Sequence, residues 1–119
     1  MSDEELLRYA AKAMGYVNPH SYRPKTNGLL WMSESGFPTT WRPFDDDADA
    51  FKLMVKLDIG VHHGWTYADE NVPYANVCAQ HIPSMIEVGE IKGDDPKAAT
   101  RRAIVRAAAE IGKNMEKNT

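Results

Sequence analysis

The sequence of 119 residues is poor in cysteine and has no excess of positive charge, and each absence excludes a class of protein. Cys78 is the single cysteine, so no internal disulfide can form, and a reducing cytoplasm is the expected setting. The formal net charge of -3 argues against general nucleic-acid binding, which normally needs a basic surface. We therefore expect a cytoplasmic protein whose partners are not nucleic acids in general.

Long apolar runs are also lacking. No stretch approaches the roughly 18 apolar residues of a membrane-spanning helix, and the acidic residues near the N-terminus differ from the basic start of a signal peptide. We therefore expect no membrane association. The apolar fraction of 43% and the charged fraction of 26% are those of an ordinary soluble domain. The length predicts a single domain over residues 1–119.

The motifs of the well-marked enzyme classes are missing as well. The sequence contains no glycine-rich phosphate loop, no Gly-x-Ser-x-Gly elbow and no His-Glu-x-x-His helix. Cys78 lies in a Val-Cys-Ala run, where a small core residue is a better interpretation than a thiol nucleophile paired with His81. A non-enzymatic role is therefore favoured, and we predict no catalytic residue, no metal ligand and no cofactor.

What the sequence does contain is organised around residues 41–59. Pro43 disfavours helix in the residue before it, so that a helix can begin only after this point. Asp45 or Asp46 is placed to cap that helix, and apolar residues then recur at helical spacing. The aspartates of this stretch suit the positive end of a helix dipole, which explains them without a metal site.

Two further helices are indicated near the two ends of the sequence. Ser2 and Glu5 have the spacing of a capping box, and a glycine closes the pattern, which predicts a helix over residues 3–14. Asp95 as cap and a proline at the first helical position predict another over residues 96–115. Its alanine-rich stripe predicts a close approach to the elements it covers. Its basic residues are expected to form a solvated face: Lys97, Arg101, Arg102 and Arg106.

Short segments between the helices are typical of strands. They are residues 29–32, 39–42, 59–63, 72–79 and 85–88. Strands that follow one another through short turns usually pair antiparallel. We therefore predict an α+β fold in which three helices pack on one mainly antiparallel sheet of about four strands, as a single-domain sandwich.

The residue types in segment 60–82 are explained less well by the requirements of folding than those in the rest of the sequence. Aromatic and histidine side chains gather there in a stretch interrupted by glycine and proline, and loops on a scaffold concentrate binding residues. We predict that any ligand or partner site lies in this segment. Adjacent histidines on a strand point to opposite faces, so only one of the first two can join a given site. The alternative is that the aromatic residues complete the core. The candidate residues are His62, His63, Trp65, Tyr67, Tyr74 and His81.

Three segments, residues 4–15, 41–50 and 99–112, together resemble small uncharacterised proteins of tailed bacteriophages and prophages. The middle one combines Trp-x-Pro with Asp-Asp-x-x-Asp-Ala. The group is similar to the phage α/β/α ("ABA") sandwich domain. The resemblance implies a phage gene product expressed in a bacterial cytoplasm, and it brings no catalytic residues with it. Residues 60–92 carry none of the resemblance.

Three hypotheses on function follow. The favoured one is a phage or prophage accessory protein that binds a bacterial host protein. The second is a small-molecule binder, for example of a nucleotide signal used in antiviral defence, because aromatic rings stack on bases and arginine or histidine can hold phosphate. The third is a histidine-dependent enzyme of an unrecognised type. The sequence is compatible with a homo-oligomer.

Overall fold

The computed structural model describes residues 1–16, 21–32, 37–69 and 72–117. This part of the chain forms an α+β fold, as expected, with three helices and two antiparallel sheets of three strands each. The helices are α1 (Asp3–Ala13), α2 (Asp47–Lys56) and α3 (Pro96–Lys117). The first sheet consists of β1 (Tyr22–Arg23), β2 (Gly28–Met32) and β3 (Pro38–Trp41). The second consists of β4 (Gly60–Asp69), β5 (Val72–His81) and β6 (Ile86–Ile91), with the short 3-10 helix η1 (Ile82–Ser84) before β6.

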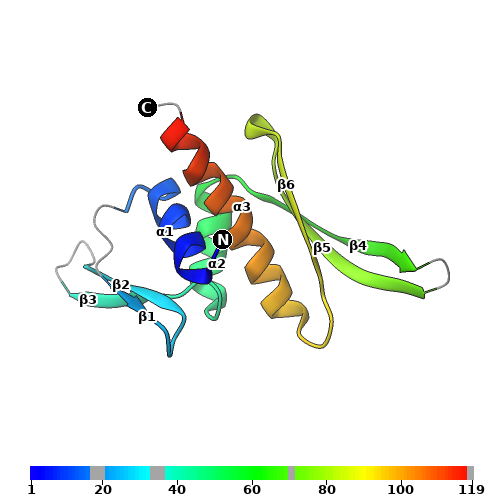
Figure 1. Ribbon diagram of the computed structural model, residues 1–119, viewed down its shortest axis with the longest axis horizontal. Coiled ribbons are helices and arrows are strands. Elements are labelled where there is room, and N and C mark those ends of the chain that lie inside the picture. The colour runs from blue at the N-terminus through cyan, green and yellow to red at the C-terminus, as the bar shows by residue number, and fades with distance from the viewer. Residues whose placement is uncertain (17–20, 33–36, 70–71, 118–119) are drawn as a thin grey trace.

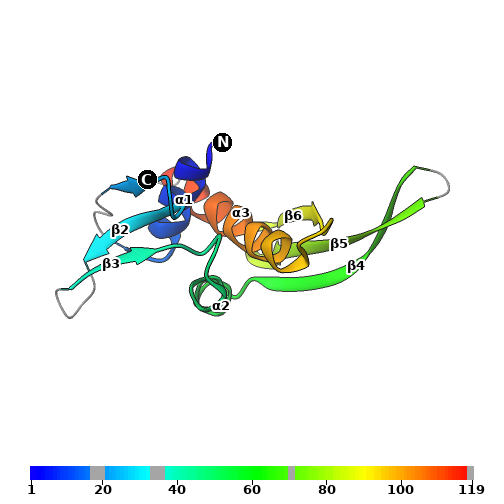
Figure 2. The same cartoon turned by 90° about the horizontal axis from the view of Figure 1, so that it is seen from below.

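The helices occupy the middle of the molecule, and the two sheets lie at opposite ends of it (Figures 1 and 2). α3 is the central element, because it contacts α1, α2, β5 and β6, while α1 also contacts β2. The β4–β5 hairpin extends away from the helices, which gives the molecule principal-axis extents of 53 × 33 × 23 Å. The fold is thus a helical centre with one short sheet and one long sheet.

The prediction of one sheet of about four strands is wrong. α2 follows β3, as the sequence predicts, but no pairing joins β3 to β4 across this helix. Each sheet is built instead from strands that follow one another in the chain and pair antiparallel. The alternation of apolar and polar residues indicates which segments are strands, but it says little about which distant strands pair.

The β4–β5 hairpin is longer and more regular than expected. The strand does not end at Gly64 but continues in register until Tyr67 lies opposite Pro73. Pro73 is tolerated because β6 pairs with β5 only as far as Asn76 and the backbone bond from Lys92 N–H to the carbonyl oxygen of Ala75 is the last on that side, so no described strand lies beside Pro73 on the outer edge of β5. We call residues 65–69 and 72–75, the part of the hairpin beyond the end of β6, the arm.

The helix ends form largely as the sequence predicts. Ser2, Asp46 and Asp95 each accept a hydrogen bond on a side-chain oxygen from the backbone N–H three residues later, at 3.2, 3.1 and 3.0 Å. These bonds satisfy donors that the first turn of a helix leaves unpaired. Of the two aspartates that could cap α2, Asp46 is the one that does so. Gly15 follows α1 with a φ of 78°, as a glycine that closes a helix should.

One hydrophobic cluster connects all three helices to both sheets. Its largest fully buried members come from different elements: Leu7, Leu29, Leu53, Val77 and Val105. The close approach predicted for α3 is confirmed where it passes α1, because a Cβ atom at Gly112 would collide with the carbonyl oxygen of Tyr9. The alanines of α3 allow similar proximity along its length, and four of them have no exposed area: Ala103, Ala107, Ala108 and Ala109.

The basic residues of α3 do not form a uniformly solvated face. Arg102 pairs with Asp3 at 3.2 Å and with Glu90 at 3.5 Å, so it links α3 to the start of α1 and to β6. Arg106 pairs with the same Glu90 at 2.8 Å. The expectation fails because the acidic partners come from distant parts of the sequence.

Candidate functional site

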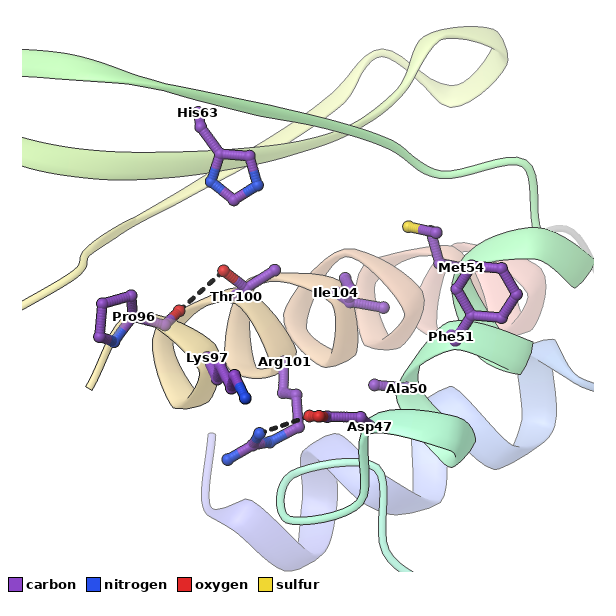
Figure 3. Close-up of a pocket in the computed structure, with 10 residues that line it drawn as sticks. All are labelled: Asp47, Ala50, Phe51, Met54, His63, Pro96, Lys97, Thr100, Arg101 and Ile104. Carbon is purple, nitrogen blue, oxygen red and sulfur yellow. Dashed lines mark hydrogen bonds and ion pairs between the residues drawn. The ribbon is translucent and has the colours of Figure 1, made fainter.

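A pocket of about 390 Å³ lies between α2, the N-terminal half of α3, and β4 (Figure 3). We call it the α2–α3 pocket. Most of its lining is apolar, with a polar group at one side. The lining residues are Asp47, Ala50, Phe51 and Met54 from α2, His63 from β4, and Pro96, Lys97, Thr100, Arg101 and Ile104 from α3.

The apolar part of the pocket is formed where α2 faces α3. Ala50 is buried, Met54 is half-buried, and Ile104 supplies the facing side chain from α3. Phe51 is different, because it lines the pocket with 61% of its surface exposed. Figure 3 shows Phe51 and Met54 at one end of the pocket and Pro96 at the other. The fold therefore leaves an aromatic ring uncovered at the mouth of an apolar pocket.

The polar side of the pocket is organised by Arg101. Its Nη1 pairs with Asp47 Oδ1 at 2.6 Å, and its Nε donates to the carbonyl oxygen of Phe44 at 2.6 Å. These bonds hold the turn before α2 against α3, and they use the directional donors of the guanidinium. Thr100 Oγ1 donates to the carbonyl oxygen of Pro96 at 2.8 Å, so this hydroxyl is also engaged.

Lys97 and His63 are the remaining polar residues of the pocket. Lys97 is exposed and makes no ion pair with any residue in the described part of the chain. His63 is exposed and lies across the pocket from α3 (Figure 3). The pocket can therefore offer an approaching ligand an apolar surface, one ammonium group and one imidazole.

The structure separates the residues that the sequence predicted as a site. His63 lines the pocket, whereas His62, one position earlier in β4, belongs to the opposite face of the sheet. Trp65 is on the same face as His63 but lies in the arm, where it is 72% exposed. The alternative that Trp65 completes the core does not hold, because most of its surface is accessible. Its role in binding stays a prediction.

Of the other three candidates, His81 alone has a described side chain. His81 lies at the far end of β5, where its Nδ1 is 2.9 Å from Ser84 Oγ. The backbones of Tyr67 and Tyr74 belong to β4 and β5, and their side chains fall outside the described part of the structure. Within the residues that the structure describes, no three histidine, cysteine or acidic side chains are placed to hold a metal ion.

Sequence reasoning missed the contribution of α2 and α3 to this pocket. The helical spacing of apolar residues after Pro43 predicts one face that serves folding, yet α2 buries only Ala50 and Leu53 and leaves Phe51 exposed at the pocket. The signal was present in the sequence, because apolar residues occupy more of α2 than one buried stripe needs. Val55, for example, is 56% exposed.

The comparisons with known proteins leave the family undecided. No protein-family model matches the chain, and searches of curated proteins and of solved structures found no match. The resemblance to phage proteins therefore stays a prediction. Among the described residues, no helix has the length and apolar character needed to cross a membrane.

Proposed function

We propose that this protein is a non-enzymatic binding protein that docks a partner protein on the α2–α3 pocket. The observation that carries this proposal is the exposed ring of Phe51 at the mouth of an apolar pocket. Folding leaves this ring accessible to solvent, although burying apolar area is favourable at about 25 cal/mol per Å². Aromatic side chains beside a pocket are frequent anchors of protein interfaces.

The chemistry of the pocket defines the partner in general terms. A bulky apolar side chain of the partner would enter between Met54 and Ile104 and cover Phe51. Lys97 at the rim would form an ion pair with an acidic residue next to that side chain. The pair would add little to the binding free energy, as expected of an exposed ion pair. Most of the affinity would therefore come from apolar contact, and the rim would favour one orientation of the partner.

A nucleotide is the weaker alternative for the same pocket. A phosphate group is usually held by several converging donors. Arg101 already donates from Nε to the carbonyl oxygen of Phe44 and from Nη1 to Asp47, so its charge is engaged within the fold, and Lys97 and His63 are the other basic side chains of the described lining. The apolar majority of the lining suits a protein side chain better.

The source of the partner belongs to the proposal as well. The resemblance of residues 4–15, 41–50 and 99–112 to phage proteins supports a phage accessory protein that acts in the bacterial cytoplasm. The partner would then be a bacterial host protein, bound without chemical modification.

A capture experiment with matched variants tests the proposal. Tagged wild-type protein, Phe51→Asp and Val55→Asp are each used to retain proteins from a bacterial lysate. Both substitutions add one carboxylate to an exposed position of α2, but only Phe51 lines the pocket. We expect a specific protein to be retained by the wild type and by Val55→Asp and to be lost with Phe51→Asp.

Two results would contradict the proposal. One is that the wild type retains no specific protein in repeated captures. The other is that Phe51→Asp retains the same protein as well as the wild type does, which would place the docking surface elsewhere. Circular dichroism of both variants controls for the fold, since each substitution replaces a side chain that is more than half exposed.

A further inference from the structure

β4 is a long strand with one free edge. In the second sheet the strand order is β4-β5-β6, so β4 pairs with β5 and has no strand on its other side within the described part of the chain. In that part, no backbone group of a helix or loop hydrogen-bonds to the main chain of residues 60–66. A row of unpaired N–H and C=O groups is a template on which another strand can pair.

The opposite edge of the same sheet is protected. β6 has six residues, including Glu87 and Glu90. Arg106 Nη1 reaches this strand from α3 and donates to the carbonyl oxygen of Gly89 at 2.9 Å and to Glu90 Oε1 at 2.8 Å. Charged side chains and occupied main-chain groups are common means by which proteins prevent pairing at a sheet edge.

β4 carries none of these protections over most of its length. Its ten residues include no lysine, arginine or proline, and its one acidic residue is Asp69 at the end. The irregularity of its pairing with β5 also lies at the end, between Tyr67 and Asp69. The regular stretch from residue 60 to residue 67 therefore has no lysine, arginine or acidic side chain, and it is open to a further strand.

We propose that β4 pairs antiparallel with β4 of a second copy of this chain, which joins the two sheets into one sheet of six strands. A partner must bring a free strand of similar length that adds no like charges at the seam. A second β4 meets these conditions by its own sequence. Self-pairing about a two-fold axis also forms the closed, isologous contact that is usual in homodimers.

The shape of the molecule determines how two such copies would be arranged. Figure 2 shows β4 along one border of the sheet, with α2 beside the start of the strand and the arm extending away from the body. An antiparallel second copy places its own α2 beside the far end of β4, beyond the reach of the first α2. The bodies of the two copies then lie at opposite ends of the seam.

The register follows from the extent of the regular stretch. Gly64 lies near the middle of residues 60–67, and an axis there sets Trp65 of each copy opposite His63 of the other. Residues opposite one another in an antiparallel pair lie on the same face of the sheet. The exposed indole would then gain a cross-strand neighbour, and each α2–α3 pocket would gain an aromatic side chain beside His63. The pairing does not depend on the proposed function.

Sedimentation of the full chain over a range of concentrations tests the pairing. We expect the wild type to convert from monomer to dimer as concentration rises. His62→Lys adds a charge to an exposed position of β4, and we expect the dimer dissociation constant to rise about tenfold or more, since a lysine on an edge strand opposes pairing with another strand. Glu87→Lys, the matched change on the protected edge strand β6, should leave the constant unchanged. A wild type that stays monomeric up to about 1 mM, or equal dissociation constants for the two variants, would overturn the proposal.

Cross-linking tests the register independently of affinity. Gly64→Cys and Gly89→Cys are compared in a Cys78→Ser background under mild oxidation. A Cβ atom fits at either glycine, because its nearest neighbours would lie at 3.4 Å or more for Gly64 and 3.9 Å or more for Gly89. Antiparallel partners lie within the range of Cα separations that a disulfide spans. We expect a disulfide-linked dimer from Gly64→Cys and little from Gly89→Cys. No dimer from Gly64→Cys, or equal yields from both, would contradict the register.

Discussion

The two sheets have the same simple strand order but differ in how they meet the helices. Both are antiparallel and both consist of three consecutive strands. The strands of the first have two, five and four residues, and its Trp41 is 5% exposed. In the second, β4 and β5 have ten residues each, and its Trp65 is 72% exposed.

This difference shows which apolar residues serve the fold. The core residue Trp41 removes a large apolar area from water, so its side chain contributes to stability. Trp65 lies on the helix-facing side of its sheet but in the arm, where most of its surface is exposed. Its apolar area is therefore available for contact with another molecule, whereas that of Trp41 is already used.

Trp41→Ala should have the largest effect on stability. Trp41 is buried and makes an edge-to-face contact with the ring of Tyr16, with centroids 5.5 Å apart and ring planes at 89°. Removing the indole leaves a cavity, so we expect a loss of about 3–5 kcal/mol in the free energy of unfolding. Urea denaturation followed by circular dichroism measures it. A loss below about 1 kcal/mol would show that the first sheet is not part of the stabilising core.

A pair of glycines extends the comparison from tryptophans to the backbone. At Gly112 an added Cβ would collide with the main chain of Tyr9, so Gly112→Ala must push α1 away from α3. We expect a cost of about 1–3 kcal/mol, as for other overpacked cores. At Gly64 the nearest atom is a side-chain oxygen of Asn76 at 3.4 Å, and we expect Gly64→Ala to change stability by about 0.5 kcal/mol or less. Thermal and urea unfolding compare the two, and equal losses would contradict the distinction.

Tyr16 should give a smaller effect that appears at alkaline pH. Burial, with a further contribution from the carboxylate of Asp49, raises the pKa of Tyr16 above its ordinary value of 10.0. The folded protein therefore holds this proton more tightly than the unfolded chain does. The resulting stability is fully present below a pH of about 10 and is lost as the pH rises through the folded-state pKa. We expect the free energy of unfolding to fall less steeply above that pH in Tyr16→Phe than in the wild type. If the free energy of unfolding depended on pH with the same slope in both proteins, the buried hydroxyl of Tyr16 would not be the cause of this loss.

The predictable parts of this fold are those that local sequence determines. The starts of the three helices could be placed because a capping side chain, such as that of Ser2 or Asp95, acts on a backbone group three residues away. The division into two sheets could not be predicted, since it depends on which strands meet in space. The length of the arm was missed because Pro73 is acceptable only where β6 has already ended, and that boundary is a property of the whole sheet.

The candidate site was predictable only in part, for the same reason. The segment that the sequence indicated does contain His63, which lines the pocket, and Trp65, which is exposed beside it in β4. The rest of the pocket comes from α2 and α3, which are brought together by Arg101 and its contacts with Asp47 and the turn before α2. The spacing of residues within one segment cannot predict a contact between two helices that are far apart in the sequence.

The free energy of unfolding of Trp65→Ala tests most directly the claim that the indole in the arm, unlike that of Trp41, is not part of the stabilising core. We expect a change of about 0.5 kcal/mol or less relative to the wild type, measured by urea denaturation at a concentration low enough to keep the chain monomeric. The slope of the free energy against urea should also stay the same, because the residue adds little to the area exposed on unfolding. A loss of about 3 kcal/mol or more, the size expected for a buried tryptophan, would contradict the account.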